Sequence, residues 1–431
     1  MWSQVPLRAL LQAAGSGTWG QEPNGPDETY PVLRSTNIRD GRLTFDDVAF
    51  RSVPEEIAER YMLREDDILV TTSSGSSQLL GKNAIVESLP PQWPRCLFSN
   101  FTWRLRPNPS LVHPRFVYFY LNSRSARAEL QRIQSTTSGL RNLNTTLYLD
   151  QPVPLAPLSE QRRIFEILDQ GERLRRLRGE ADAKADRILP ALLTKVLGPV
   201  SDWDLHPKSR PLGELVEFIS GGTPSKKDGR LWSGEIPWVS PKDMKHDFIR
   251  DTEDHVSVAA VDETGLRTIQ AESVLLVVRG MILARSVPVA LNLTPVTINQ
   301  DMKGLVPKVA EITGRYLWAA SYLARTRLLA LVRTAAHGTR KLDTPDLLGV
   351  RIVVPSAEQR CLVEDAVRAR EFSLEKQRHA QRHMSQLFST LLRRAFAGTL
   401  TASWRQAHMK ELLQEMEQQG RALEGGSEPR R

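Results

Sequence analysis

A helix opening that occurs twice is the feature of this sequence that most constrains its fold. The stretch PLSEQRRIFEIL begins at Pro157, and the stretch PSAEQRCLVEDA begins at Pro355. Both run Pro-x-x-Glu-Gln-Arg into an apolar pattern with helical spacing. An internal repeat of this kind predicts that one fold occurs twice in the chain, because two copies of one sequence pattern are expected to fold alike.

Three further pairs of similar stretches precede the helix openings, and they occur in the same order in both copies. They are YPVLRSTNI (30–38) with IPWVSPKDM (236–244), ILVTTSSG (68–75) with SVLLVVRG (273–280), and SGLRNLN (138–144) with HGTRKLD (337–343). The offset between the copies drifts only from 206 to 198, and the order is kept. We therefore interpret the chain as a tandem duplication whose two copies have diverged.

Each copy begins with a long segment rich in Gly, Pro, Trp and Thr. Its short apolar runs are bounded by turn signals such as SGGTPSKKDGR (220–230), which is typical of a β-rich globular domain with a few helices. The most apolar run, residues 273–293, is interrupted by Arg279 and Arg285. It is too short and too charged to span a membrane, so it predicts consecutive buried strands.

Each copy then continues into a segment of about 40 residues that has the apolar spacing of a long helix. The apolar positions of the first segment are Ile164, Ile167, Gly171, Leu174, Leu177, Ala181, Ala185, Ile188, Leu192 and Val196. Those of the second segment are Leu362, Ala366, Ala369, Phe372, Ala380, Met384, Leu387, Leu391 and Ala395. Steps of three and four place each set on one face of a helix roughly 60 Å long.

A helix of that length with one narrow apolar stripe needs a partner that buries the stripe. The helix of the other copy is the obvious partner; the alternative is that each stripe packs on its own globular domain. Paired with each other, the two helices would form an antiparallel coiled coil with pseudo-two-fold symmetry. The expected fold class is therefore α+β, with two β-rich globular domains alternating with two long helices that pack as this coiled coil.

The repeat predicts five segments along the chain. These are a first β-rich domain at 1–157, a first long helix at 158–200, a second β-rich domain at 201–354, a second long helix at 355–400, and a C-terminal tail at 401–431. Gly198 and Gly398 are expected to end the two helices. Ser356 and Gln359 have the spacing of a capping box at the start of the second helix, and Ser159 is placed to cap the first.

The overall charge suits a polyanionic partner. The chain carries 58 Lys and Arg against 50 Asp and Glu, a formal net charge of +8, and its sequence pI is about 9.6. A basic protein without such a partner is the alternative. Cys96 and Cys361 have no disulfide or metal-ligand spacing, and we expect both to be reduced. The start MWSQVPLRALLQAAGSG lacks the basic region of a secretion signal, so the expected location is cytoplasmic.

The sequence lacks the motifs of the common catalytic and cofactor sites. GSSQLLGKN (75–83) is similar to a phosphate-binding loop, but five residues separate its glycines instead of four, and Asn83 replaces the Ser or Thr that would hold magnesium. His379 and His383 lie four apart without a third metal ligand, which is typical of a solvated helix face. We therefore expect a chain that is not an enzyme and that has neither a metal nor a cofactor of its own.

Loops that combine glycine with basic or amide side chains are the candidates for contact with a nucleic acid. Backbone N–H groups of SGGTPSKK can approach phosphate, Arg and Lys can bind guanine, and Asn can bind adenine in the major groove. The candidates are Gly221, Gly222, Thr223, Ser225, Lys226, Lys227, Arg34, Asn37, Lys242, Lys245, Arg141, Asn142, Asn144, Arg340 and Lys341. Plain surface turns are the alternative, but the recurrence of Gly-x-Arg-x-Leu in both copies favours a shared DNA-facing or docking role.

This plan resembles the specificity (S) subunit of type I restriction–modification systems. The two Pro-x-x-Glu-Gln-Arg openings carry the resemblance, together with LGELVEFISGGTPSKK (212–227), IPWVSPKDM, VLLVVRGMILA (274–284), INQDMKGLVP (298–307) and LLRRAFAGTLT (391–401). The first copy departs from this pattern. AGSGTWGQEPNG (14–25) stands where the second copy has SGGTPSKKDG, and LFSNFTWRLRP (97–107) stands where it has INQDMKGLVP.

The resemblance implies that each β-rich domain is a target-recognition domain that binds one half of a bipartite site in double-stranded DNA. It also implies that the helices set the spacer between the half-sites and dock two modification (methyltransferase) subunits, and that restriction (ATP-dependent translocase and nuclease) subunits join them. S-adenosylmethionine, ATP and Mg are then expected on the partner subunits, and no membrane is expected. The implied partner-docking residues are Glu160, Gln161, Glu358 and Gln359, although the helix dipole alone could explain acidic residues there.

Two other interpretations of the sequence stay open. A coiled-coil scaffold or adaptor that binds protein partners would need the same helices, and sequence-specific DNA affinity of the assembled complex distinguishes it. An enzyme with an unrecognised site is the other interpretation. Methyltransferase or nuclease activity of the isolated chain would reveal such an enzyme.

Overall fold

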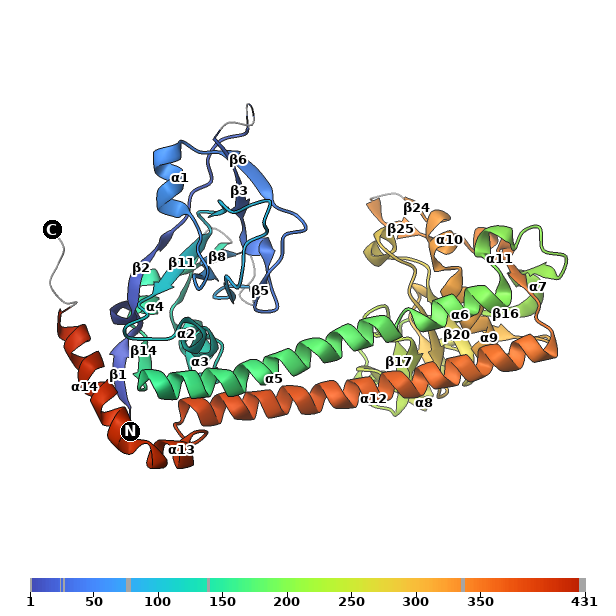
Figure 1. Cartoon of the computed structure of the whole chain (residues 1–431). Helices are drawn as coiled ribbons and strands as arrows, with labels where there is room; N and C mark the ends of the chain where they lie inside the picture. Colours follow the sequence, from blue (N-terminus) through green and yellow to red (C-terminus); the bar gives the residue numbers. More distant parts are fainter. Residues whose placement is uncertain are drawn as a thin grey trace. The chain divides into compact units, whose positions relative to one another are not determined.

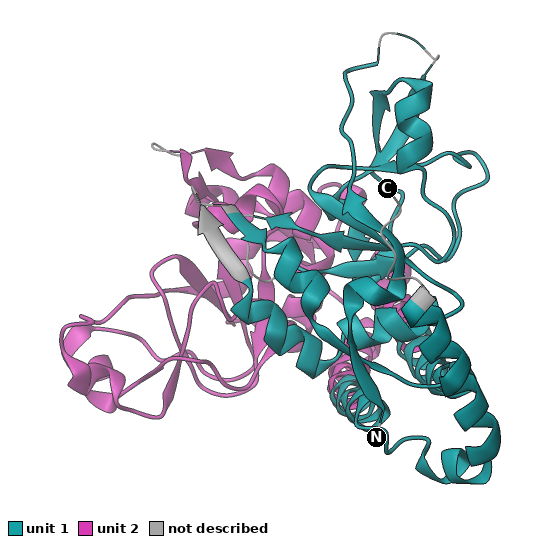
Figure 2. Cartoon of the chain, turned by 90° about the vertical axis from the view of Figure 1, so that its left-hand side faces the viewer, with its two compact units in different colours: residues 1–177, 381–431 teal, residues 178–380 magenta. Residues whose placement is uncertain are grey.

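The computed structural model describes residues 2–23, 25, 28–74, 79–137, 140–334 and 338–425. The chain divides into two compact units: unit 1 comprises residues 1–177 and 381–431, and unit 2 comprises residues 178–380 (Figure 2). Each unit contains one β-rich domain and turns of both long helices, α5 (Leu158–Ala185) and α12 (Ala357–Phe396), which Figure 1 labels. Each compact unit therefore combines parts of both repeats.

Unit 1 is built around an antiparallel sheet in the order β2-β11-β7-β9. Its strands are β2 (Leu11–Ser16), β11 (Thr102–Pro107), β7 (Ile68–Thr71) and β9 (Asn83–Ile85). The smaller sheets are β10 (Leu97–Phe98) with β3 (Thr29–Leu33) and β6 (Ala49–Ser52), β12 (Gln134–Thr137) with β13 (Leu140–Leu143) and β8 (Ser73–Ser74), β1 (Ser3–Pro6) with β14 (Pro152–Leu155), and β4 (Ile38–Arg39) with β5 (Arg42–Leu43). Its other helices are α1 (Glu55–Tyr61), α2 (Pro114–Leu121), α3 (Arg124–Arg132), α4 (Thr145–Asp150), α13 (Ala402–Ala407) and α14 (Met409–Gly425).

Unit 2 is built around a sheet in the order β16-β23-β20-β21-β18. Its strands are β16 (Val216–Ser220), β23 (Met302–Pro307), β20 (Ser273–Val277), β21 (Val289–Asn292) and β18 (Phe248–Ile249). The smaller sheets are β19 (His255–Val256) with β17 (Ile236–Val239) and β22 (Thr297–Ile298), β15 (Ser209–Pro211) with β26 (Arg351–Val353), and β24 (Arg333–Thr334) with β25 (Arg340–Lys341). Its other helices are α6 (Ile188–Leu197), α7 (Leu212–Leu215), α8 (Val258–Thr264), α9 (Gly314–Leu323), α10 (Arg325–Ala330) and α11 (Thr344–Gly349).

The strand pairing of unit 1 recurs in unit 2. β11 pairs antiparallel with β2 and β7, as β23 does with β16 and β20. β3 runs parallel to β10 as β17 runs parallel to β22, and β1 pairs with β14 as β15 pairs with β26. This repetition agrees with the tandem duplication read from the sequence, and both copies mix helices and strands as expected.

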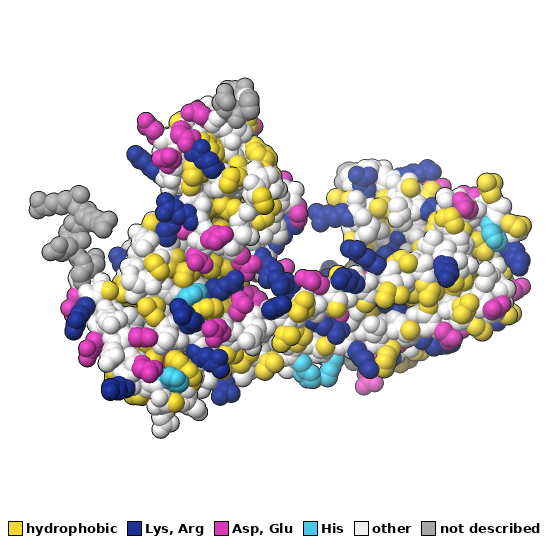
Figure 3. Space-filling model, in the orientation of Figure 1, with side chains coloured by type: hydrophobic (Ala, Val, Ile, Leu, Met, Phe, Trp, Pro, Cys, Tyr) yellow, Lys and Arg dark blue, Asp and Glu magenta, His cyan; other side chains and the backbone are white. Residues whose placement is uncertain are grey.

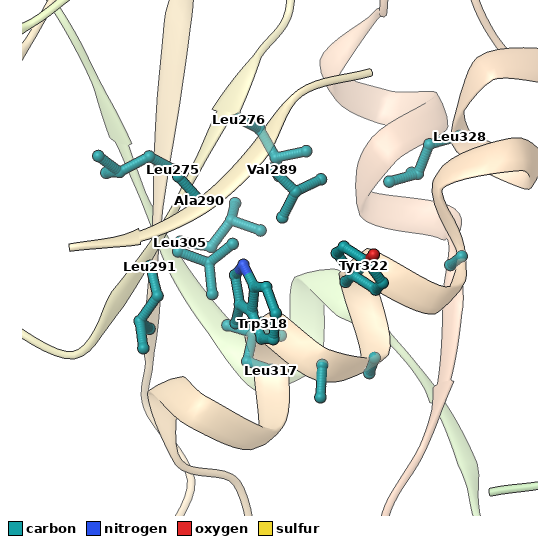
Figure 4. Close-up of a cluster of buried hydrophobic side chains, with 14 of the residues drawn as sticks. Leu275, Leu276, Val289, Ala290, Leu291, Leu305, Leu317, Trp318, Tyr322 and Leu328 are labelled. Carbon is teal, nitrogen blue, oxygen red and sulfur yellow. The ribbon is translucent and has the colours of Figure 1, made fainter. Parts of the chain in front are cut away.

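Helix α9 supplies the central aromatic side chains of the unit 2 core, where it packs against the sheet (Figure 4). The buried ring of Trp318 lies 4.9 Å from that of Phe248 and 5.0 Å from that of Tyr322. The apolar run 273–293 contains β20 and β21, two buried antiparallel strands, so the prediction of consecutive buried strands is confirmed. In the ranges that the structure describes, no helix is both long and apolar enough to cross a membrane.

The segment expected to form the first long helix contains two helices. α5 ends at Ala185 and α6 begins at Ile188. Pro190 lies in the first turn of α6, where it has no N–H to donate to the carbonyl of Asp186, and its ring would crowd that carbonyl in a continuous helix. The expectation of one unbroken helix is therefore wrong at residues 186–187.

The buried face of α6 lies one residue beyond the apolar stripe read from the sequence. Leu189, Leu193 and Leu197 are buried, whereas Ile188 is 63% exposed and Leu192 is 37% exposed. Apolar residues stand at both helical phases in this segment, so spacing alone does not decide which of them face the core.

The same displacement occurs in parts of the other long helices. At the start of α12, Val363 and Val367 are wholly buried while Leu362 is half-exposed. In α5, Leu168 is wholly buried and the adjacent Ile167 is partly exposed, although Ile164 of the predicted stripe is also wholly buried. The stripe predicted from the sequence is therefore in large part an exposed apolar face.

The predicted helix ends are confirmed at the second copy. The Gln359 N–H donates to Ser356 Oγ (3.2 Å) and the Ser356 N–H donates to Gln359 Oε1 (3.0 Å), which is the reciprocal pattern of a capping box. Gly198 follows α6 directly and Gly398 lies two residues after α12, with φ of 74° and 71°. A positive φ is strained for other residues, which explains why glycine stands at both ends.

The core of each unit includes residues from the long helices of both copies. In unit 1 these residues are Ile164, Leu168, Phe388, Leu392 and Ala395. In unit 2 they are Leu189, Leu193, Leu197, Val363 and Val367. Gly171 allows the close approach in unit 1, because a Cβ there would lie 3.1 Å from the Phe388 ring.

We predict that Leu193→Ala destabilises unit 2 by about 2–5 kcal/mol, because the side chain is wholly buried and its removal leaves a cavity. Leu192→Ala is the matched control and should cost less than about 1 kcal/mol, because Leu192 is partly exposed. Urea unfolding followed by tryptophan fluorescence measures both variants. An equal loss of stability in the two would contradict the observed helix phase.

Candidate nucleic-acid interface

Three segments of unit 2 meet at one edge of its main sheet. β16 ends and β23 begins at this edge, since Ser220 pairs with Lys303, and β20 ends there too, since Val277 pairs with Met302. The loop after β16 is joined to the approach to β23 by the hydrogen bond from the Gly222 N–H to the carbonyl of Ile298 (2.9 Å). The sheet thus brings together segments that lie far apart in the sequence.

Strand β25 adds a fourth segment to this edge. The Gly280 N–H donates to the carbonyl of Arg340 (3.0 Å), and Arg279 forms an isolated bridge with Lys341. The side chains of Arg340 and Lys341 are held by Thr334 Oγ1 (2.7 Å) and by the Asp343 carboxylate (2.5 Å). We call residues 221–223, 278–280, 299–301 and 340–341 the unit 2 edge. It gathers three cationic side chains from two segments.

The Gly-rich loop of the unit 2 edge is in direct contact with two amide side chains. A Cβ on Gly221 would lie 2.1 Å from the carbonyl oxygen of Asn299, so only glycine permits this approach. Thr223 Oγ1 hydrogen-bonds the side chain of Gln300 and accepts from Asn299 Nδ2 (3.3 Å). The indole N–H of Trp238 donates to the carbonyl of Gly222 (3.0 Å). The loop therefore positions an exposed carboxamide, that of Gln300, at the surface.

The rest of the Gly-rich loop carries exposed charge. Lys226 and Lys227 are exposed, and the Lys226 ammonium lies 5.9 Å from the ring of Trp232. The Trp232 indole N–H donates to the carbonyl of Ser225 (3.1 Å). These contacts fix the loop backbone and leave its charged ends in solvent.

Unit 1 has an edge of the same construction. A Cβ on Gly17 would lie 1.9 Å from the carbonyl oxygen of Phe98, and the Thr18 N–H donates to that oxygen (2.9 Å). The Thr72 N–H donates to the carbonyl of Phe101 (3.0 Å) as the Val278 N–H donates to Asp301 (2.8 Å) in unit 2. We call residues 17–19, 72–74, 99–101 and 141–142 the unit 1 edge.

The two edges share a backbone frame and differ in their side chains. Arg141 is exposed and pairs with Ser74, and Asn142 pairs with Ser73, whose Oγ donates to Asn142 Oδ1 (2.6 Å). Phe101, 51% exposed, occupies the place of Asp301 in unit 2. Equal frames with unequal side chains are suited to two different ligand surfaces.

Two further predicted residues lie close to these edges. Arg34 follows β3, and the carbonyl of Leu33 accepts from the Ser99 N–H (2.8 Å). Lys242 follows β17, and the carbonyl of Val239 accepts from the Asn299 N–H (2.9 Å).

Both of these basic side chains form ion pairs with acidic residues. Lys242 is paired with Glu253 (3.1 Å) and Asp254 (3.0 Å), and hydrogen bonds with Asp254 and then Glu253 raise the pKa of its ammonium group. Arg34 is paired with Asp47 (2.9 Å). Lys245, which is exposed, lies farther along the second loop.

Asn37 is not a contact residue. Its side chain is 2% exposed, its Nδ2 donates to the carbonyls of Thr44 and Asp47 (3.0 Å each), and its Oδ1 accepts from the Arg34 N–H (2.9 Å). The Asn37 carboxamide is hydrogen-bonded to backbone groups of its own turn, which it stabilises. The prediction that Asn37 contacts a nucleic acid is therefore corrected. Asn144 is exposed, and its Oδ1 caps α4 by accepting from the Leu147 N–H (3.1 Å).

Arg279, Gln300 and, in unit 1, Phe101 are exposed on the edges and were not predicted from the sequence, whereas Asn299 is buried and holds the turn through the Asp301 N–H (2.7 Å). Their signal was present in INQDMKGLVP and LFSNFTWRLRP, which hold equivalent places in the two copies. What was missing is the pairing of β16 with β23, which alone brings residues 299–301 next to the Gly-rich loop. Parts of the predicted loops, namely Ser138, Gly139 and His337, lie outside the described residues.

Unit 1 also contains a polar cavity of about 620 Å³, which we call the cationic pocket. Its basic residues are Lys82, Arg124, Arg127, Arg175 and Arg393. Its acidic residues are Asp40 and Glu172. Lys and Arg side chains gather on unit 1 near β5 and α5 in Figure 3.

The positive charge of the cationic pocket is largely uncompensated. Among the described residues, no ion pair reaches Lys82, Arg124 or Arg393. Burial raises the pKa of Glu172, which accepts a hydrogen bond from the Tyr118 hydroxyl (2.9 Å). This arrangement favours an anion in the pocket.

The four residues expected to dock a partner differ in accessibility. Glu160 and Gln161 are wholly buried, so neither side chain is exposed to a partner surface while the C-terminal residues cover them. Glu358 is exposed, and Gln359 is half-buried in its capping box, where its Nε2 also donates to the carbonyl of Val196 (3.2 Å). Within the described ranges, no group of three His, Cys, Asp or Glu side chains is placed to hold a metal ion.

A family model described as the type I restriction modification DNA specificity domain matches residues 2–180 and 206–379. The chain belongs to this family. Two matches along one chain agree with the duplicated strand pairing of units 1 and 2. The two edges are therefore equivalent regions of two specificity domains.

Several relatives have names of the same kind. The type I restriction enzyme EcoR124I/EcoR124II specificity subunit of Escherichia coli is 34% identical over 157 residues, which cover 36% of this chain and 39% of that subunit. The StySPI specificity subunit of Salmonella potsdam is 24% identical over 442 residues, covering 94% of this chain and 90% of that one. The chain thus matches less than half the length of the first relative and nearly all of the second.

Solved structures show the same fold at low sequence identity. A chain from a structure on complex assembly and conformational transition of the type I R-M system has a TM-score of 0.54 and 18% identity, covering 93% of this chain and 98% of that chain. The S subunit of a type I restriction–modification system from M. genitalium has a TM-score of 0.51 and 14% identity, covering 92% and 96%. These similarities support the fold described above.

We predict that Gly221→Ala disrupts the unit 2 edge, because its Cβ would collide with the backbone of Asn299. The amides of residues 296–303 should then exchange hydrogen faster, with a local loss of about 1–3 kcal/mol. Gly229→Ala is the matched control, because a Cβ there has no neighbour within 4 Å. Unchanged exchange in Gly221→Ala would show that the loop does not depend on this contact.

Proposed function

We propose that the chain is the DNA sequence-specificity subunit of a type I restriction–modification complex and is itself not an enzyme. Each unit binds one half of a bipartite site in double-stranded DNA through its edge. The observation that carries this proposal is the pair of edges with one backbone frame and two sets of side chains, in a chain that belongs to the specificity family.

The side chains of the edges suit base recognition in the major groove. Arg141 in unit 1 and Arg279, Arg340 and Lys341 in unit 2 offer donors to guanine, while Asn142 offers an amide that can bind adenine. Gln300 offers a second such amide from unit 2. The different composition of the two edges supports two different half-sites.

Backbone phosphates are proposed to bind at groups that carry no sequence information. The Gly-rich loop offers N–H groups together with the exposed Lys226 and Lys227. The cationic pocket of unit 1 offers further unpaired cations. Contacts of this kind position a duplex and make its binding dependent on salt.

The long helices are proposed to pack as an antiparallel coiled coil that sets the spacer between the half-sites. Contacts within each unit support the direction. In unit 1, Gly171 of α5 lies against Phe388 of α12. In unit 2, Gln359 at the start of α12 reaches Val196 near the end of α6. Higher numbers on the first helix thus meet lower numbers on the second.

The partners are proposed to be modification subunits that carry S-adenosylmethionine and restriction subunits that use ATP and Mg. Modification subunits would dock on the exposed apolar face of the helices and at the base of α12. That face includes Leu174, Leu177, Leu362, Phe372 and Leu387, which are 47–61% exposed. Exposed apolar patches of this kind mark protein–protein interfaces.

Methylation of host DNA tests the proposal. We predict that co-expression of this chain with a modification subunit of the same system produces methylated adenine in a motif of two short blocks with a fixed gap. Single-molecule sequencing of host DNA reads this motif, and a strain that expresses the modification subunit alone is the control. A stable complex without chain-dependent methylation would favour a protein-binding scaffold instead.

A further inference from the structure

The base of α5 is covered by the C-terminal tail of the chain. In the described residues α14 has no counterpart in the first copy, where the chain passes from α6 through residues 198–208 into β15. Both α13 and α14 also lie outside the two segments that the family model matches. The role of this tail is therefore not explained by DNA recognition.

Helix α14 supplies a cap that the first copy lacks. Leu158 stands where Ser356 begins the capping box of the second copy, so α5 cannot cap its own first turn in that way. The Ser159 N–H and hydroxyl instead donate to Glu415 Oε2 of α14 (2.9 and 3.0 Å). The expectation that Ser159 caps the helix is thus corrected. A carboxylate at this position satisfies an unpaired N–H and complements the helix dipole.

The same region of unit 1 buries the Glu160 carboxylate completely. It accepts hydrogen bonds from the Thr401 hydroxyl (2.6 Å), Arg405 Nε (2.8 Å) and the Trp2 indole N–H (3.1 Å). A buried carboxylate is tolerated only with such partners. Both ends of the chain therefore meet on the first turn of α5.

Two glutamines share the next contact. Gln161 of α5 and Gln419 of α14 both donate to the carbonyls of Leu111 and Ala156, at 2.7–3.2 Å. Gln419 Oε1 is buried without a hydrogen-bond partner among the described residues. Beside Gln419, only Leu412 is buried among the described side chains of α14. Ala422 and Leu423 are partly buried against the unit 1 core. The seat of α14 therefore combines a few apolar contacts with specific hydrogen bonds, and one of its polar atoms is left unsatisfied.

The equivalent base in unit 2 is open. Ser356 and Gln359 cap α12 without help, Glu358 is exposed, and Leu362 is 52% exposed. No ion pair reaches Glu358 in the ranges that the structure describes. The same sequence motif is therefore covered by C-terminal residues at the start of α5 and left exposed at the start of α12.

We propose that α14 is a built-in occupant of the base of α5, so that the two docking sites for modification subunits are inequivalent. The first subunit binds at the open base of α12. The second binds at α5 only when α14 leaves its seat. This inference rests on the proposed docking of modification subunits. Only two of the described side chains of α14 are fully buried, which permits its release, and Met409, Leu413 and Met416 leave a second apolar face of α14 exposed for the incoming subunit.

Stepwise binding of a modification subunit to the full-length chain tests this inference. Calorimetry and native mass spectrometry should show that the second subunit binds at least about tenfold more weakly than the first. In Glu415→Ala/Gln419→Ala the difference in affinity between the first and the second subunit should narrow by about 5–100-fold, because two contacts that hold α14 are removed. Glu417→Ala is the matched control, since Glu417 is exposed on the same helix and makes none of these contacts.

A second variant, which lacks α14 altogether, tests the inference even if α14 stays in its seat in the double variant. A chain that ends at His408 keeps Thr401 and Arg405 on Glu160 and lacks α14. It should bind both subunits with similar affinity, and in the full-length chain the second subunit should speed hydrogen exchange across residues 409–424. Two equal sites in the unaltered chain, or an unchanged gap in both variants, would overturn the inference. Absence of any binding would instead overturn the proposed docking itself.

Discussion

Burial of the long helices is the constraint on which the rest of the structure depends. Each helix has apolar side chains that it cannot bury alone, and a helix of this kind is stable only when tertiary packing covers part of its apolar surface. Ile164 and Leu168 of the first copy share the unit 1 core with Phe388 and Leu392 of the second. The second unit uses the later turns of the first helix and the early turns of the second in the same way. Neither copy is complete without the helix of the other.

The duplicated sheet lets recognition change without changing the frame. Close contact of Gly17 with Phe98 and of Gly221 with Asn299 fixes the loop after the first strand of each main sheet against the segment before its partner strand. Backbone groups make these contacts, so the neighbouring side chains are free to differ. Phe101 and Asp301 occupy equivalent places with opposite chemistry. A fixed frame with variable side chains is what two unlike half-sites would require.

Much of the fold could be predicted from the sequence because local signals were strong. The repeat, the buried strands in 273–293, the capping box at Ser356 and the glycine at each helix end all depend on neighbouring residues. The phase of the buried stripe could not be predicted, because Leu192 and Leu193 are both apolar and only packing selects one of them. Pro190 is visible in the sequence, but the apolar spacing continues past it and predicts one helix, whereas α5 ends at Ala185.

The candidate site was less predictable, because long-range contacts decide which polar residues are exposed. Asn37 looked like a contact residue, yet its carboxamide is consumed by backbone groups of Thr44 and Asp47. Glu160 is implied as a docking residue by the resemblance, and residues more than 240 positions later cover it. Gln300 lies beside the Gly-rich loop only because β16 pairs with β23. Residue type and spacing cannot report such contacts.

Independent reading of two half-sites is the central claim, and the methylation motif of a variant tests it most directly. Gln300→Ala removes an exposed side chain of the unit 2 edge alone. Single-molecule sequencing of co-expressing cells should then show one block of the motif relaxed at one or two positions, with the other block and the gap unchanged. Equal changes in both blocks, or a change in the gap, would contradict the account.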